Sequence, residues 1–116
     1  MNPDVKTKWV AALRSGEFEQ GRNRLNDGGN FCCLGVLCEL AVAEGVIVKE
    51  PRHLASGQET AVVLYDGRST QPSVKVMDWA GLTQADPEVG RTTLMGMNDE
   101  AMAPFTEIAD AIDEYL

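Results

Sequence analysis

Apolar residues are densest between residues 30 and 45, where the chain reads NFCCLGVLCELAVAEG. Asn30 is a favoured N-cap residue, and Gly45 is a favoured residue just past a helix end. Apolar residues fill nearly every side of the intervening helix, with one stripe at helical spacing formed by Phe31, Leu34, Cys38 and Ala41. The pattern predicts a buried central helix over residues 30–44, around which the rest of the chain packs.

Three further stretches combine an apolar face with a helix-start signal. Asn2 followed by Pro3 predicts a helix that begins the chain and ends at Gly16. Gln71-Pro72 predicts a helix through SVKVMDWA, ended by Gly81. Pro104 fits the first position of a last helix, whose core stripe is Phe105, Ile108, Ala109 and Ile112.

Two short runs rich in β-branched residues predict a pair of strands. VIVK (46–49) and AVVLY (61–65) are separated by a polar segment that contains Pro51 and Gly57. TTLMGM (92–97) fits either a strand or a turn of helix. A chain of 116 residues is expected to form one compact domain, residues 1–116. The predicted fold of this domain is α+β, with about four helices around the central helix 30–44 and a small antiparallel sheet.

Cysteine and histidine usage argues against a metal site, a cofactor and catalysis. The three cysteines lie within seven residues on the predicted central helix, so we expect them to be reduced and buried. His53 is the only histidine, which leaves no second histidine for a zinc site or a catalytic triad. The chain has no apolar run of 18 residues and its start lacks the order of a signal peptide, so we expect a cytoplasmic protein that does not enter a membrane.

Negative charge is concentrated toward the C-terminal end. The formal net charge is −8, and residues 86–116 hold eight acidic residues and one arginine, which is a net charge of −7. Duplex nucleic acid is therefore not an expected partner. The acidic side chains of the predicted last helix offer a surface for a basic partner protein, formed by Glu107, Asp110, Asp113 and Glu114.

The segment before the central helix could bind an anion. Gln20, Gly21, Arg22 and Arg24 lie just ahead of Asn30, the predicted start of that helix. A helix N-terminus presents free N–H groups and a dipole that favour negative charge, and guanidinium groups could complete such a site. The alternative interpretation is an ordinary solvated turn, because the segment matches neither a Walker A motif nor a dinucleotide fingerprint.

Several stretches resemble a family of small proteins encoded by tailed bacteriophages and prophages. They are WVAALRSGEFEQGRNRL, FCCLGVLCELA, DWAGLT and MNDEAMAPFTEIADAI, and they cover most of the chain. FCCLGVLC is the most distinctive of them. The resemblance implies no activity, but it implies a setting, that of an accessory phage protein in the cytoplasm of a bacterial host.

These observations favour a non-enzymatic protein that binds a host or phage protein. Trp79 fits either the core or an exposed anchor for that partner. Three alternative functions stay open: a binder of an anionic small molecule or nucleotide, an acidic mimic of DNA, and an enzyme. A second copy of the chain, in a homodimer, is a further possible partner. No cofactor or metal is expected.

Overall fold

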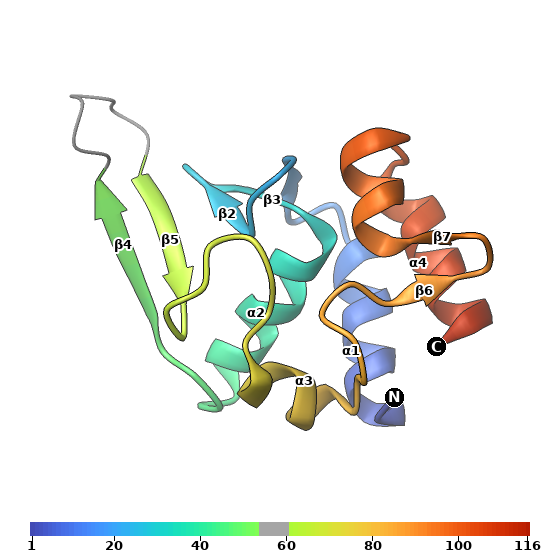
Figure 1. Ribbon diagram of the computed structural model, residues 1–116, viewed down its shortest axis with the longest axis horizontal. Coiled ribbons are helices and arrows are strands. Elements are labelled where there is room, and N and C mark those ends of the chain that lie inside the picture. The colour runs from blue at the N-terminus through green and yellow to red at the C-terminus, as the bar shows by residue number, and fades with distance from the viewer. Residues whose placement is uncertain (54–60) are drawn as a thin grey trace.

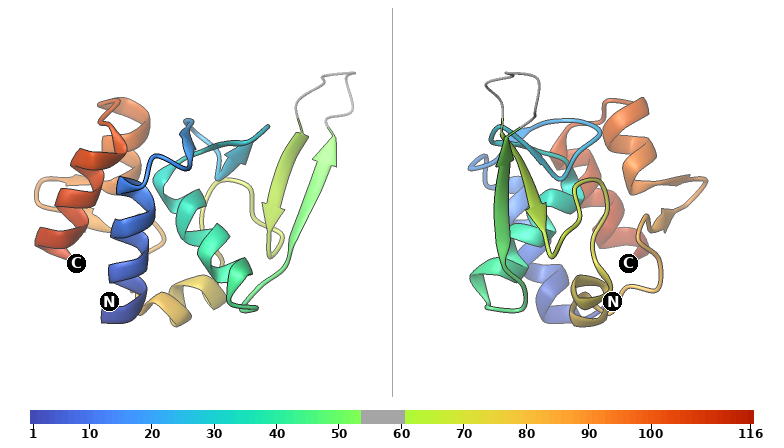
Figure 2. Two further views of the ribbon diagram at one scale, coloured as in Figure 1. Left: turned by 180° about the vertical axis from the view of Figure 1, so that it is seen from behind. Right: turned by 60° about the vertical axis from the view of Figure 1, so that its left-hand side comes forward.

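A computed structural model describes residues 1–53 and 61–116 and confirms the α+β class. The helices are α1 (Pro3–Arg14), α2 (Cys33–Ala43), α3 (Val74–Ala80) and α4 (Phe105–Tyr115), with a π-helical turn, η1 (Gly96–Glu100). Helix α1 packs against both α2 and α4. Figures 1 and 2 show these three helices together, with the β4–β5 hairpin at the opposite end of the molecule from α4.

The main sheet is mixed, whereas the sequence predicted an antiparallel one. Its five strands run in the order β1-β3-β2-β5-β4, and only the β1–β3 pair is parallel. The strands are β1 (Glu19–Gln20), β2 (Asn26–Asp27), β3 (Asn30–Phe31), β4 (Lys49–His53) and β5 (Ala61–Tyr65). A separate two-stranded sheet joins β6 (Glu88–Val89) to β7 (Thr92–Thr93).

The central helix is present, but it starts later than predicted. The prediction that Asn30 caps it is wrong, because Asn30 and Phe31 form β3 between β1 and β2. Cys32 occupies the N-cap position and makes no side-chain capping hydrogen bond. Pairing with strands on both sides satisfies the β3 backbone as well as a helix would. The predicted end is correct, since Gly45 follows the C-cap with a φ of 76°.

The strand predicted over residues 46–49 is displaced along the chain. Strand β4 begins at Lys49, while Ile47 is buried and Val48 is 78% exposed. Pro51 is compatible with β4 because this strand lies at the edge of the sheet, where a missing N–H disrupts no ladder. His53 ends β4, and β5 matches the predicted AVVLY strand.

Two other helix starts differ from the prediction by one or more residues. Helix α3 begins at Val74, and its N-cap is Ser73, whose hydroxyl accepts from the Val76 N–H. Pro104 is the N-cap of α4 and not its first helical residue. The ambiguous stretch 92–97 contains both alternatives, a short strand followed by the start of a helical turn.

One hydrophobic cluster holds the helices together. Trp9 is fully buried, and its Nε1 donates to the Cys33 carbonyl at 2.9 Å. The predicted stripe of α4 is buried, and so are all three cysteines. Trp79 is partly buried and packs against this cluster. None of the helices within the described residues has the length and apolarity needed to span a membrane.

Candidate functional site

The Asn98 side chain, from η1, lies at the N-terminus of α2, next to the segment for which the sequence left open either an anion site or an ordinary turn. It is fully buried, and Oδ1 accepts from the Cys33 N–H at 3.2 Å and from Gln20 Nε2 at 3.0 Å. Its Nδ2 donates to the Gly21 carbonyl at 2.9 Å and to Asp99 Oδ1 at 2.8 Å. We call these contacts the Asn98 network. It joins η1 to the segment before α2, and it provides an acceptor for the N–H group of Cys33, the first residue of the helix.

The predicted anion-binding residues are only partly brought together. Gln20 and Gly21 join the Asn98 network, whereas Arg22 and Asn30 are exposed and Arg24 is half-buried. Asp99 adds a carboxylate at this position, and its Oδ1 also accepts from the Asn23 N–H at 3.0 Å. An amide oxygen and a carboxylate therefore stand where a phosphate would need donors, and the geometry does not favour an anion there.

Sequence reasoning missed Asn98 and Asp99. Both follow the apolar run LMGM and fall within a stretch that carries the family resemblance, but that resemblance assigns no role to either residue. The signal that could have found them is burial, because a buried asparagine must find partners for its donors and acceptors. That requirement becomes visible only once η1 is placed beside α2.

The three thiols are unsuited to nucleophilic chemistry. All three are free and buried, and burial raises the pKa of Cys32 from 9.0 to about 11. Burial also raises the pKa of Cys33 and of Cys38 above its ordinary value. A thiol that stays protonated at neutral pH is a poor nucleophile and metal ligand. Across residues 1–53 and 61–116, no group of three His, Cys, Asp or Glu residues could hold a metal ion.

A second polar cluster fastens the β4–β5 hairpin to α2. The Tyr65 hydroxyl donates to Glu39 Oε2 at 2.6 Å and accepts from Asn26 Nδ2 at 3.1 Å. Lys49 Nζ lies 2.9 Å from Glu39 Oε1. Desolvation, followed by the hydrogen bond to Glu39, raises the pKa of Tyr65, so its hydroxyl stays a donor. Each group in this cluster is satisfied by another, which indicates a structural role.

The acidic face of α4 lies in solvent and is partly neutralised by α1. Its four predicted residues are all exposed: Glu107, Asp110, Asp113 and Glu114. Arg14 of α1 lies 2.7 Å from Asp110 and 3.7 Å from Asp113. Glu107 and Glu114 take part in no ion pair within the described part of the chain. Because the single charge of Arg14 is shared by two aspartates, the face keeps a net negative charge, to which Glu107 and Glu114 add theirs.

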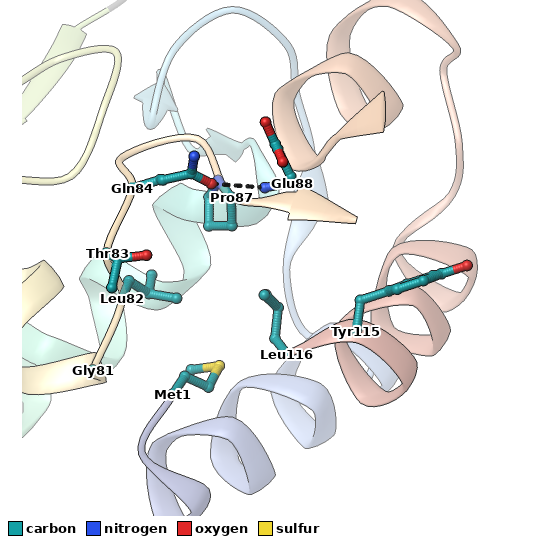
Figure 3. Close-up of a pocket in the computed structure, with 9 residues that line it drawn as sticks. All are labelled: Met1, Gly81, Leu82, Thr83, Gln84, Pro87, Glu88, Tyr115 and Leu116. Carbon is teal, nitrogen blue, oxygen red and sulfur yellow. Dashed lines mark hydrogen bonds between the residues drawn. The ribbon is translucent and has the colours of Figure 1, made fainter. Parts of the chain in front are cut away.

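A pocket opens at the end of α4. Its volume is about 190 Å³, and it is lined by residues from both ends of the chain, the segment after α3, and β6: Met1, Gly81, Leu82, Thr83, Gln84, Pro87, Glu88, Tyr115 and Leu116. Figure 3 shows the side chains of Met1, Leu82, Pro87 and Leu116 surrounding a common space. Sequence reasoning did not predict it, because no periodicity relates these segments.

Comparison with known proteins identifies the family. A family model matches residues 1–116, and its description is Domain of unknown function (DUF8296). The chain belongs to this family. No curated protein and no solved structure matches the chain. Membership of DUF8296 brings no activity with it, so function has to be argued from the surface of the molecule.

Proposed function

We propose that the protein acts without catalysis, by binding a partner protein through one surface, the α4 surface, which consists of the acidic face of α4 and the pocket at its end. One observation carries this proposal: the pocket is lined by Tyr115 and Leu116, which directly follow the acidic residues of the same helix. A hollow lined by both apolar and polar side chains, next to charged ones, is typical of protein-binding surfaces, in which a buried anchor is ringed by polar contacts.

Charge supports a basic partner. Glu107 and Glu114 are exposed and outside the Arg14 ion pairs of the described residues, and Glu88 lies at the pocket. Opposite charge on a partner would speed association and select against acidic proteins. The phage setting implied by the sequence resemblance makes a host or phage protein the expected partner. A host DNA-binding protein would be the partner if the acidic face acts as a mimic of DNA.

Affinity capture with matched charge variants tests the proposal. Glu107→Lys/Glu114→Lys reverses the two unpaired charges, while Glu50→Lys in β4 makes the same kind of change at the far end of the molecule (Figure 1). Asp110 is left unchanged because reversing it would also break the contact with Arg14. We expect wild type and Glu50→Lys to capture the same stoichiometric host or phage protein, and the double variant to lose it. Equal capture by all three proteins would place the binding surface elsewhere.

A further inference from the structure

The main sheet ends in an open edge at strand β4. This strand is the last in the sheet order, and Figures 1 and 2 show it on the outer side of the β4–β5 hairpin. Residues 49–52 are exposed, and within the described residues no strand pairs with the outer side of β4. An open edge presents backbone groups to which another strand can add. We infer that Pro51 closes this edge and prevents β4 from pairing with the β4 of a second copy of the chain.

The hydrogen bonds at one end of the β4–β5 ladder show which of its residue pairs are bonded. The Tyr65 N–H donates to the Arg68 carbonyl at 2.8 Å, and the Arg68 N–H donates to the Tyr65 carbonyl at 3.0 Å. Both backbone groups of Tyr65 are used in this turn, so the Lys49–Tyr65 pair of the ladder is not a hydrogen-bonded pair. One step further, the Asp66 N–H donates to the Val48 carbonyl at 3.1 Å, as the alternation of an antiparallel ladder requires.

The same alternation places the backbone of Pro51 at the open edge. Pro51 lies two residues from Lys49 and opposite Val63, so the Pro51–Val63 pair is not hydrogen-bonded either. The nitrogen and the carbonyl of Pro51 therefore point away from β5, as do those of Lys49 and His53. Proline has no N–H, and its ring occupies the space in which that hydrogen would lie. The middle donor of the edge is thus missing, and the ring obstructs the approach of another strand.

Apart from the proline, the edge is complementary to its own copy. Antiparallel pairing about a two-fold axis at Pro51 would place Glu50 of each chain opposite Arg52 of the other. A register in which Glu50 faces Glu50, or Arg52 faces Arg52, would bring like charges together. The remaining charge before the proline, Lys49, is already paired with Glu39 at 2.9 Å. In the register that the charges favour, Pro51 faces Pro51, so both central hydrogen bonds are lost.

Sedimentation velocity of Pro51→Val and wild type tests the inference. Valine restores the missing N–H and favours a strand, so we expect Pro51→Val to form a dimer whose share rises with concentration. Wild type should show no association through β4. Amide hydrogen exchange locates the contact: in the Pro51→Val dimer, exchange at Lys49 and His53 should slow by about tenfold or more relative to the dilute protein.

Two matched variants separate the backbone effect from the effect of an added apolar side chain. Glu50→Val introduces the same side chain one position earlier, where the N–H points to β5 and the proline is kept, so we expect no dimer. Pro51→Val/Arg52→Glu restores the donor but places glutamate opposite Glu50 of the copy. We expect this double variant to dimerise more weakly than Pro51→Val.

Pro51→Thr provides a second test if Pro51→Val does not fold, as judged by circular dichroism. The inference is overturned if the folded variants sediment as wild type does, or if Glu50→Val dimerises as readily as Pro51→Val. It is also overturned if wild type itself protects the amides of Lys49 and His53 as its concentration rises. Failure of both Pro51→Val and Pro51→Thr to fold would contradict it too, because Pro51 would then be required within the fold and not at its edge.

Discussion

The buried Asn98 side chain makes four hydrogen bonds at the junction between η1 and α2. Replacing it by alanine removes four hydrogen bonds and leaves the Cys33 N–H and the Gly21 carbonyl without their side-chain partner in a buried site. We expect Asn98→Ala to lower the free energy of unfolding by about 2–5 kcal/mol, because buried unpaired polar groups are costly. Urea denaturation followed by circular dichroism measures this.

Asn98→Asp separates the donor from the acceptor role of this side chain. Aspartate keeps an oxygen for the Cys33 N–H, but it cannot donate to the Gly21 carbonyl, and it places a second carboxylate beside Asp99. We therefore expect Asn98→Asp to have a lower free energy of unfolding than wild type as well. A stability equal to that of wild type for both variants would show that the Asn98 network does not hold the junction.

The buried thiols predict a loss of stability at high pH. Because the folded-state pKa of Cys32 is raised from 9.0 to about 11, the folded protein keeps a proton that the unfolded chain releases above pH 9. The stability that the protonated Cys32 thiol contributes to the folded state is fully present below pH 9 and is lost as the pH rises through 11. The free energy of unfolding should fall by about 1.4 kcal/mol per pH unit for each such thiol.

Denaturant titrations between pH 8.5 and 10.5 would measure this slope. Cys33 and Cys38 should add to it, because burial also raises their pKa values. Cys32→Ala provides the comparison, since it removes one titrating group and should make the slope shallower. A free energy of unfolding that stays constant over this range would contradict the burial of the thiols.

At the scale of elements, Gly35 governs how α2 approaches the segment before it. A Cβ added to Gly35 would overlap the Leu25 carbonyl group, which is backbone and cannot move aside like a flexible side chain. Glycine to alanine inside a helix ordinarily stabilises by about 1 kcal/mol. Here we expect the opposite sign, a loss of about 2 kcal/mol or more, because the helix must shift away from Leu25. Thermal unfolding of Gly35→Ala gives the sign directly, and an increase in melting temperature would contradict the close packing.

The sequence predicted the elements whose signals are local. The apolar stripe of α4, the Asn2 cap of α1 and the Gly45 end of α2 depend on residues within a turn or two, and all were correct. Asn30 is a good cap by composition, yet pairing with strands on either side of it overrides that preference.

The candidate site was less predictable than the fold, because most of its contacts join segments that are far apart in the sequence. The acidic residues of α4 could be placed on its solvent face from periodicity alone, and the structure exposes them. Their ion pairs with Arg14 could not be predicted, because Arg14 and Asp110 are separated by 96 residues. The pocket and the Asn98 network likewise join distant segments.

At the scale of the whole molecule, charge asymmetry predicts how binding responds to salt. Glu107 and Glu114 lie on the α4 surface and take part in no ion pair of the described residues, and the β4–β5 hairpin stands at the other end of the molecule (Figure 2). Raising ionic strength from about 0.05 to 0.5 M should slow association of the captured partner, because screening shortens the reach of these charges. The rate constant for Glu107→Lys/Glu114→Lys should be lower and less sensitive to salt, and that for Glu50→Lys should match wild type. Stopped-flow or surface plasmon resonance measurements would detect this difference, and identical salt dependence in all three proteins would contradict it.

The measurement that tests the proposed binding surface most directly is an NMR map of the complex. Isotope-labelled protein would be titrated with the unlabelled captured partner, and the changes would be assigned residue by residue. We predict that the largest changes fall on the exposed face of α4 and on the pocket segment 81–88, while the β4–β5 hairpin stays unchanged. Changes centred on β4 and β5, with α4 and the pocket unaffected, would contradict the account.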